Sequence, residues 1–262
     1  MKQNRLTKDQ KEELFELYKT FEYSYKELAQ KFNKSVSSIS CLLTREGLKG
    51  KFENNHSRKY AINQYYFDII DTEEKAYFLG FLYADGCNHK NNTKVSMFLK
   101  EEDKNILIKL NNLLQPSKPL TYRKREIGTP QWGIQISNKR ISDKLSELGC
   151  IPNKTFNLNF PNENQIPNNL IIHFIRGYFD GDGWLGKKDI SITSCITFCS
   201  QLSMFLYKTY NIETKYKIKN KVIELYFSRK DVKLFLNLLY KNSNIYLERK
   251  YQRYLEYHNK TN

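Results

Sequence analysis

The sequence has no long hydrophobic run, and its first residues carry no export signal. No segment approaches the roughly 18 apolar residues that a membrane-spanning helix needs. The opening stretch, MKQNRLTKDQ, is charged and lacks the apolar core of a signal peptide. We therefore expect an intracellular protein without a membrane partner.

Cysteine is also scarce, and its spacing does not indicate a disulfide framework. The closest two of the five cysteines are separated by three residues, without a second pair or nearby histidines. Such scattered residues are typical of reduced, structural thiols inside the cell. A zinc site is the alternative for these residues, Cys41, Cys87, Cys150, Cys195 and Cys199.

Acidic residues are strongly outnumbered by basic ones. The chain has 43 lysines and arginines against 28 aspartates and glutamates, a formal charge of +15 and a pI near 9.4. Such an excess is typical of proteins that bind a polyanion, nucleic acid before membrane. Codon drift in an AT-rich genome is the alternative. The 262 residues provide room for one larger domain and a small one.

The first 48 residues have the periodicity of three short helices. Capping boxes begin at Thr7 and Ser24, and a third helix is expected from Ser35 to Gly47. Apolar residues at i, i+3, i+4 and i+7 spacing predict a shared core. They are Leu14, Leu17, Tyr18 and Phe21, then Tyr25, Leu28, Ala29 and Phe32, then Val36, Ile39 and Leu43.

Only Asn33 and Lys34 separate the second helix from the third, as in a helix-turn-helix. The stretch SYKELAQKFNKSVSSISCLLTREG resembles the DNA-binding three-helix modules of resolvases and many regulators. The resemblance implies a DNA-binding domain over residues 1–48. A three-helix bundle that binds protein, or nothing, is the alternative. Outward-facing residues of the recognition helix would be Ser37, Ser38, Cys41, Thr44 and Arg45.

Residues 49–71 form a polar and basic stretch without sustained periodicity. They include the segment GKFENNHSRKYAINQYYF. A tether that crosses a phosphate backbone and plain disorder both fit this composition. We therefore expect a basic linker between the first domain and the rest of the chain.

The remainder contains an internal repeat. The stretch FLGFLYADG, residues 78–86, returns as IRGYFDGDG at residues 175–183. Superposing Gly80 on Gly177 aligns Asp85 with Asp182. The later segments SNKRISDKLSELG and SRKDVKLFLNLLY match at nearly the same offset. Two matches at nearly one offset indicate a duplication.

Each copy predicts the same order of elements, αββαββα, over residues 72–166 and 167–262. The fold class is therefore α+β, with two pseudo-symmetric halves preceded by a small all-α domain. The motif helices are expected from Thr72 to Gly86 and from after Pro167 to Gly183. The other elements are β-prone runs at 94–99 and 190–193, amphipathic helices at 103–114 and 197–210, hairpins at 120–125 with 132–137 and 214–219 with 222–228, and a last helix in each copy.

Small residues stand four apart in both motif helices. Gly80 and Ala84 lie on one face of the first, and Gly177 and Gly181 on one face of the second. Such faces allow two helix backbones to pack in near contact. If the helices pack through them, their C-terminal ends meet and bring the two aligned aspartates together.

A pair of aspartates at two helix C-termini is electrostatically unfavourable. Each opposes the helix dipole by about 0.3 to 1 kcal/mol. Their mutual repulsion raises one pKa unless a cation neutralises the pair. An arrangement that costs stability indicates a function, and oxygen ligands suit Mg²⁺. Ordinary helix-to-turn endings are the alternative for Asp85-Gly86 and Asp182-Gly183.

At these motifs the sequence resembles the LAGLIDADG homing endonucleases in their single-chain, two-motif form. FLGFLYADG keeps the Gly, Ala-Asp and Gly of that signature, and IRGYFDGDG keeps Gly, Asp, Asp and Gly. The resemblance covers roughly residues 72–257. It implies a LAGLIDADG-like fold with the motif helices at its centre, and Mg²⁺ or Mn²⁺ bound by Asp85 and Asp182 over two scissile phosphates.

The same resemblance implies site-specific cleavage of double-stranded DNA that leaves short 3′ overhangs. The protein would act as a monomer with pseudo-dimeric symmetry. It would belong to an intron or a free-standing mobile element, in the cytoplasm of a bacterium or phage host or in an organelle. Family members with other roles leave two alternatives, a DNA-binding transcriptional regulator that does not cleave and an RNA-splicing maturase. The presence of both carboxylates favours the enzyme.

Two residues depart from the family signature. Tyr83 replaces its first acid, which leaves the metal interpretation intact because the family's ligand is the later acid. Arg176 stands where a small residue is usual, which puts the close packing of the second helix in question. Asp180 aligns with Tyr83 and, two residues from Asp182 along a helix, should point elsewhere.

Family members also carry a basic residue late in each half, where a cation helps to stabilise the transition state. The segment IPNKT offers Lys154, and LERKYQRY offers Lys250. Both are therefore candidate catalytic residues, and an ordinary surface lysine is the alternative for each.

In this family the strands form a saddle over the DNA major groove. Trp132, Ile134 and Ile136 are expected to face the core, with the alternate residues facing outward. Arginine, lysine and glutamine suit base edges and phosphates, although alternating lysines also occur on any solvated edge strand. The expected DNA contacts are Arg123, Arg125, Gln131, Gln135 and Ser137 in the first half, and Lys215, Lys217 and Lys219 in the second.

Overall fold

The computed structural model describes residues 6–20, 22–48, 60–90, 93–126, 128–186 and 189–259. By their internal contacts the residues form two units. One is Met1–Tyr66 with Ile108–Pro119, and the other is Phe67–Leu107 with Leu120–Asn262. Among the described helices, none combines the length and the apolar character that a membrane crossing requires.

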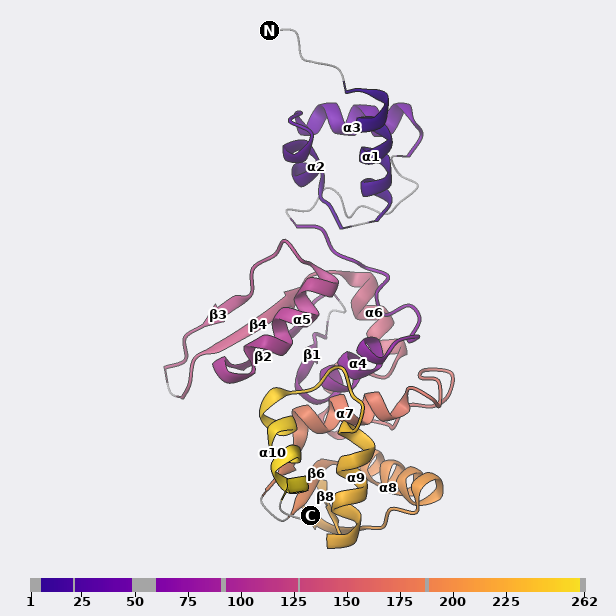
Figure 1. Cartoon of the computed structure of the whole chain (residues 1–262), viewed down its shortest axis with the longest axis vertical. Coiled ribbons are helices and arrows are strands. Elements are labelled where there is room, and N and C mark those ends of the chain that lie inside the picture. The colour runs from indigo at the N-terminus through magenta and orange to yellow at the C-terminus, as the bar shows by residue number, and fades with distance from the viewer. Residues whose placement is uncertain are drawn as a thin grey trace. The chain divides into compact units, whose positions relative to one another are not determined.

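The first unit begins with three helices, α1 (Lys8–Lys19), α2 (Tyr25–Lys31) and α3 (Val36–Arg45), as Figure 1 shows. The capping boxes at Thr7 and Ser24 are both formed, and Ser35 caps α3. Asn33 adopts a left-handed φ of 48° in the turn before α3. The buried core includes Leu14, Tyr18, Leu28, Ala29, Ile39 and Leu43.

Two details of this unit correct the sequence interpretation. Val36 is 45% exposed, because it is the first residue of α3 and faces outward there. The second part of the expected linker is folded: Ala61, Ile62 and Tyr66 are buried, and the Asn63 amide donates to the Leu114 carbonyl at 2.8 Å. Residues 49–59 of that linker, and Phe21, lie outside the described residues.

From α4 onward the chain contains the predicted αββαββα order twice, with one further helix at the end, which confirms the α+β class. By its contacts the later part of α5 belongs to the first unit and the other elements belong to the second. The first copy comprises α4 (Glu73–Asp85), β1 (Gly86–Asn88), β2 (Val95–Lys100), the 3₁₀ turn η1 (Glu101–Asp103), α5 (Lys104–Leu114), β3 (Thr121–Arg123), β4 (Gln131–Ile136), α6 (Lys139–Glu147) and the 3₁₀ turn η2 (Lys154–Phe156). The second comprises α7 (Ile171–Asp182), β5 (Gly183–Leu185), β6 (Ile190–Cys195), α8 (Ile196–Tyr210), β7 (Thr214–Lys219), β8 (Val222–Phe227), α9 (Arg229–Tyr240) and α10 (Glu248–Asn259).

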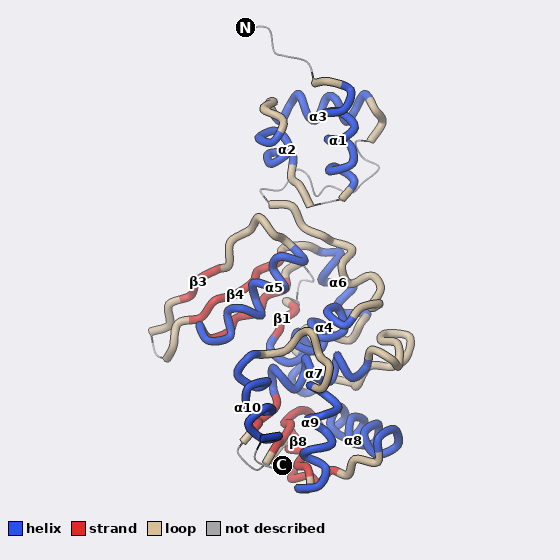
Figure 2. The backbone as a smooth tube through the Cα atoms, in the orientation of Figure 1, coloured by secondary structure: helices blue, strands red, loops and turns tan. Residues whose placement is uncertain are grey.

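Each copy forms its own antiparallel sheet, in the orders β1-β2-β4-β3 and β5-β6-β8-β7 (Figure 2). One face of each sheet carries the apolar core. In the first it presents Val95, Met97, Leu99, Ile134 and Ile136, and in the second Ile190, Ile192, Ile223, Leu225 and Phe227. We call the opposite face of each sheet the open face. Its residues alternate with the core residues along every strand.

The prediction that Trp132 faces the core needs correction. Trp132 lies on the same face as Ile134, but at the end of β4, where its ring remains half-buried. Lys104, the first residue of α5, places its ammonium group 3.6 Å from the centre of that ring. Strand β3 also ends earlier than expected, so Arg125 lies beyond it.

Candidate active site

The motif helices α4 and α7 lie side by side at the centre of the second unit (Figure 1). Their contact is made through glycine. A Cβ atom added to Gly80 would lie 2.0 Å from the Phe174 carbonyl oxygen, and one added to Gly177 would lie 1.9 Å from the Tyr77 oxygen. Real Cβ atoms essentially never approach other atoms within 3.0 Å. The two backbones therefore touch at both glycines, and neither position has room for a side chain.

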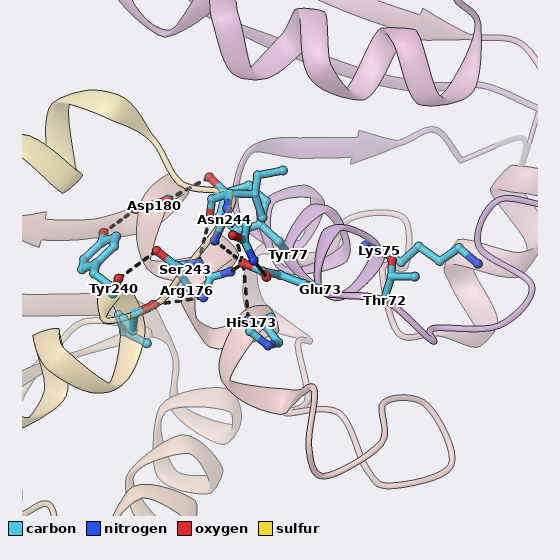
Figure 3. A network of polar contacts seen from close by, with 12 residues as sticks. Thr72, Glu73, Lys75, Tyr77, His173, Arg176, Asp180, Tyr240, Ser243 and Asn244 are labelled. Carbon is cyan, nitrogen blue, oxygen red and sulfur yellow. Dashed lines mark hydrogen bonds and ion pairs between the residues drawn. The ribbon is translucent and has the colours of Figure 1, made fainter.

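Arg176 does not disturb this contact, because its side chain leaves the interface. The guanidinium group is buried and donates to the Ile245 oxygen at 2.8 Å and the Leu239 oxygen at 3.0 Å. It also donates to Glu73 Oε1 at 2.6 Å (Figure 3). Arg176 thus links α7 to α4 and to the segment between α9 and α10, while the neighbouring Gly177 keeps the helices close.

The two aligned aspartates are the last residues of α4 and α7. Between them, Gly181 faces Ala84: a Cβ atom added to Gly181 would lie 2.3 Å from the Ala84 Cβ and 3.1 Å from Asp85 Oδ2. The structure therefore brings both carboxylates to one place, where both side chains remain exposed. Neither helix has a basic residue in its last turn to offset the charge.

This arrangement disfavours two negative charges. Asp85 reaches the surface but is closely surrounded by protein atoms. The resulting loss of hydration, followed by the charge of Asp182, raises its pKa to about 6. Burial also raises the pKa of Asp182, although the charges of Lys154 and Lys250 act in the opposite direction. The site therefore favours a cation or a shared proton.

The first candidate lysine, Lys154, lies at the start of η2, and its ammonium group reaches the end of α4. It donates to the Ala84 carbonyl oxygen at 2.6 Å and to the Tyr83 oxygen. These carbonyls belong to the last turn of the helix and have no partner within it. A cation at this position also complements the negative end of the helix dipole.

The second candidate, Lys250, occupies the matching position at the end of α7. It lies in the first turn of α10 and donates to the carbonyl oxygens of Phe179 and Gly183. Burial lowers the pKa of Lys250 to about 8, and the nearby carboxylates limit this shift. The structure thus places one lysine at each carboxylate-bearing helix end, although their roles in catalysis stay predictions.

Asp180 points away from the two aspartates, as its position along the helix predicts. It is fully buried and accepts hydrogen bonds from Tyr77 at 2.8 Å and Tyr240 at 2.5 Å, residues that Figure 3 labels. It also accepts one from the Leu247 amide at 2.7 Å. Burial raises its pKa, which these bonds oppose. Asp180 therefore anchors the chain segment that leads into α10. The anchored residue, Leu247, lies three residues before Lys250.

Glu73 is a neighbour of this site that the sequence analysis did not single out. In the structure its carboxylate binds Arg176, the Asn244 amide at 2.8 Å and the Asn244 side chain at 2.9 Å (Figure 3). Burial acts to raise the pKa of Glu73, but these bonds and the Arg176 charge outweigh it and lower the pKa. The unusual arginine in the motif was the available signal, because a buried arginine needs an acidic partner.

The open face of the first sheet carries three of the expected DNA contacts. Strand pairing places Arg123 opposite Gln131 and Gln135 opposite Ser96. The Arg123 guanidinium lies 3.8 Å from the centre of the Phe98 ring on the same face. Arg125 is exposed beyond the strand, and Ser137 is exposed just after β4.

The open face of the second sheet carries Lys215, Lys217 and Lys219, all exposed on the edge strand β7. Lys217 lies over the ring of Tyr226, with 5.0 Å between its nitrogen and the ring centre. Lys219 forms an ion pair with Glu224. The three lysines form one cationic row, partly offset at its end by a carboxylate.

The residues expected to recognise DNA on α3 divide into two groups. Ser37, Cys41, Thr44 and Arg45 are exposed. Ser38 is half-buried, and its hydroxyl lies 2.9 Å from that of Ser35 at the helix cap. A DNA-binding role for α3 stays a prediction.

The donor set at the two aspartates fits a divalent cation of the Mg²⁺ type. Within the described residues, no three His, Cys, Asp or Glu side chains gather as a complete protein-made metal site. Mg²⁺ usually binds through one or two carboxylates and completes its shell with water and substrate phosphates. The exposed pair of Asp85 and Asp182, whose charges repel each other, provides that kind of incomplete shell.

Comparison with known proteins supports the resemblance seen in the motifs. Residues 169–240 match the family model for a LAGLIDADG-like domain. This segment contains most of the second αββαββα copy, including Asp182, and is similar to LAGLIDADG-like domains. The family resemblance expected from the motif is thereby confirmed. A search of curated proteins found no match.

Several solved structures have a similar backbone. The homing endonuclease I-DmoI shows 16% identity and a TM-score of 0.44, over 64% of this chain and 94% of that one. I-WcaI bound to its DNA recognition sequence shows 16% identity and a TM-score of 0.48, over 74% and 92%. Full-length DUF199/WhiA from Thermatoga maritima shows 16% identity and a TM-score of 0.47, over 76% and 65%.

Proposed function

We propose that this chain is a site-specific DNA endonuclease that hydrolyses one phosphodiester bond in each strand at Asp85 and Asp182. The supporting observation is the pair of exposed carboxylates held together by the glycine contact of α4 and α7, at an electrostatic cost to the fold. A structural role would not require two like charges at this position. A cation shared with DNA phosphates would relieve their repulsion.

In this proposal Asp85 and Asp182 hold Mg²⁺ or Mn²⁺ between the protein and the two scissile phosphates. The bound ion would polarise a phosphate oxygen and help to generate the attacking hydroxide. Lys154 and Lys250 each use two of their three N–H donors on backbone carbonyls at or just after the end of a motif helix. The third donor of each lysine would bind a phosphate oxygen and stabilise charge that develops there.

The open faces of the two sheets would hold the DNA on either side of this centre. Arg123, Gln131 and Gln135 would contact one half-site, and the lysine row of β7 the other. The three-helix unit would extend the contact through α3, and the net charge of +15 would strengthen binding at low salt. The protein would act as a monomer, cut both strands and leave short 3′ overhangs.

Incubation with a library of randomised duplexes tests this proposal. In Ca²⁺ the protein should retain a subset of sequences, and in Mg²⁺ or Mn²⁺ it should cut them in both strands. Asp85→Asn and Asp182→Asn should bind the same duplexes without double-strand cleavage. A matched control is Asp143→Asn, a surface carboxylate paired with Lys139 on α6, which should cut normally. Specific binding by the wild type without a cut in Mg²⁺ or Mn²⁺ would instead support a transcriptional regulator.

A further inference from the structure

The open face of the second sheet carries a large exposed aromatic side chain beside the candidate active site. Trp184 is 57% exposed and lies in β5, two residues after Asp182. Its neighbours in the strand, Gly183 and Leu185, are both buried. The indole therefore projects from the side of β5 that is opposite to the core.

Strand pairing separates Trp184 from the other exposed apolar side chains on the strands. Tyr122 pairs with Trp132, Tyr216 with Leu225 and Ile218 with Ile223, so these three lie on the core-bearing faces. Trp184 pairs with Ser191, which pairs in turn with Tyr226 and, beyond it, Lys215. Among the exposed large apolar residues of the described strands, Trp184 is thus the one on an open face.

The neighbours of Trp184 on this face leave its ring accessible. Ser191, directly opposite, is small and buried, and its hydroxyl lies 3.3 Å from Glu224 Oε1. The next residue across the sheet is Tyr226, under Lys217. An exposed indole costs hydration free energy, and a ligand with a flat apolar face would remove that cost. The adjoining lysine row indicates that this ligand is also anionic.

The first half has no aromatic residue at the matching position. Its place is taken by Cys87, which lies two residues after Asp85 and pairs with Ser96. Ser96 is 3.0 Å from His89 Nε2 and is followed across the sheet by Gln135. This row contains no aromatic residue, so the duplication does not explain the tryptophan.

We propose that Trp184 is a DNA-contacting residue that stacks on a nucleotide next to the phosphate cut at Asp182. Nucleotides combine a flat apolar base with an anionic backbone, which matches the indole and the adjoining lysines. Because the bases of a duplex cover each other, this contact requires a partly unstacked base step, which flexible pyrimidine–purine steps allow most easily. The contact is one-sided because Cys87 cannot stack. The two half-sites are therefore bound unequally at their inner ends. This inference rests on the proposed endonuclease function.

The test uses the duplexes retained from the randomised library in Ca²⁺. The chain has two tryptophans, so a Trp132→Phe background leaves Trp184 as the single indole reporter. DNA binding should quench Trp184 fluorescence and protect it from acrylamide. Trp184→Ala should weaken binding about tenfold, in line with the loss of one base-stacking side chain. Trp184→Phe should retain most of the affinity, and Cys87→Ala should change it less than twofold.

The base preference of DNA binding provides a second test of this inference. Selection with Trp184→Ala should relax the base preference at one position beside the cut on the second-half strand, with the first half-site unchanged. The inference would be wrong if acrylamide still quenched Trp184 in the tightly bound complex and Trp184→Ala bound with wild-type affinity. The proposed endonuclease function would be unaffected by that result. If the wild type retains no duplex at all, the proposed function fails first and this inference fails with it.

Discussion

The two halves of the second unit share one order of elements but hold their lysines in different ways. Lys250 is buried on a helix, whereas Lys154 is half-buried on a 3₁₀ turn. Both donate to carbonyl oxygens at the end of the adjoining motif helix. The position of the ammonium group is therefore common to both halves, and the structure that supports it is not.

The aligned residues Tyr83 and Asp180 explain how different supports give the same result. The Tyr83 hydroxyl donates to the Leu148 carbonyl oxygen at 2.5 Å, on the segment that leads to Lys154. Asp180 accepts from the Leu247 amide on the segment that leads to Lys250. One position in each motif helix thus anchors the chain before the lysine, with a donor in one half and an acceptor in the other. The two halves therefore share this anchoring of the segment before the lysine but differ in the side chain that provides it.

The largest effect on stability should come from the arginine that occurs in only one half. The residue aligned with Arg176 is Leu79, which is fully buried. Arg176→Leu should lower the free energy of unfolding by about 3 kcal/mol, because the partly buried Glu73 loses its cationic partner. Urea unfolding measures this loss.

The double variant Glu73→Gln with Arg176→Leu serves as the control for that experiment. It removes the stranded charge and should recover part of the lost stability, which gives a measurable coupling energy between the two residues. If Arg176→Leu alone unfolds at the wild-type urea concentration, the proposed dependence of the second half on this ion pair is wrong.

The glycine contact should be equally sensitive in both halves. Gly80→Ala and Gly177→Ala each place a methyl group about 2 Å from a backbone oxygen, so each should cost about 3 kcal/mol. Gly128→Ala, in open space with a φ of +99°, should cost only about 1 to 2 kcal/mol through backbone strain. A large difference in urea midpoint between the two interface variants would show that the halves do not share this contact equally.

The two lysines should affect cleavage in separate strands. Lys250→Met should slow the cut near Asp182 about a hundredfold, the usual cost of removing one donor to a developing charge. Lys154→Met should slow the other cut instead. Each variant should therefore convert a supercoiled plasmid that carries a retained site into a nicked circle before any linear product forms. Equal slowing of both strands by either variant would argue against strand-specific roles.

The sequence was sufficient for features that depend on local pattern. Helix periodicity, the capping residues and the repeat of FLGFLYADG located the elements and the meeting of Asp85 with Asp182. What it could not reveal depends on contacts between distant segments. Arg176 donates to the carbonyl groups of Leu239 and Ile245, some 60 to 70 residues away. No pattern in the sequence indicates that these two carbonyl groups are free to accept. Likewise, the exposure of Trp184 follows from strand register.

The smallest expected effect is a change in melting temperature on replacing Asp85, which measures the electrostatic cost of the site independently of cleavage. Because the pKa of Asp85 is raised from 3.8 to about 6, the folded state binds a proton more tightly than the unfolded state. Stability contributed by this group is therefore lost as the pH rises from about 4 through 6, and the loss persists above that range. In EDTA at pH 7.5, Asp85→Asn should thus unfold a few degrees above the wild type.

At pH 4 this difference should disappear, because Asp85 is then largely protonated in the folded state. Asp143→Asn, which removes a surface carboxylate paired with Lys139, should show no such rise. Mg²⁺ at pH 7.5 should raise the melting temperature of the wild type but not that of Asp85→Asn, since binding to the folded state stabilises it. A lower melting temperature for Asp85→Asn in EDTA would mean that the carboxylate supports the fold, and the main argument for a functional site at these helix ends would fail.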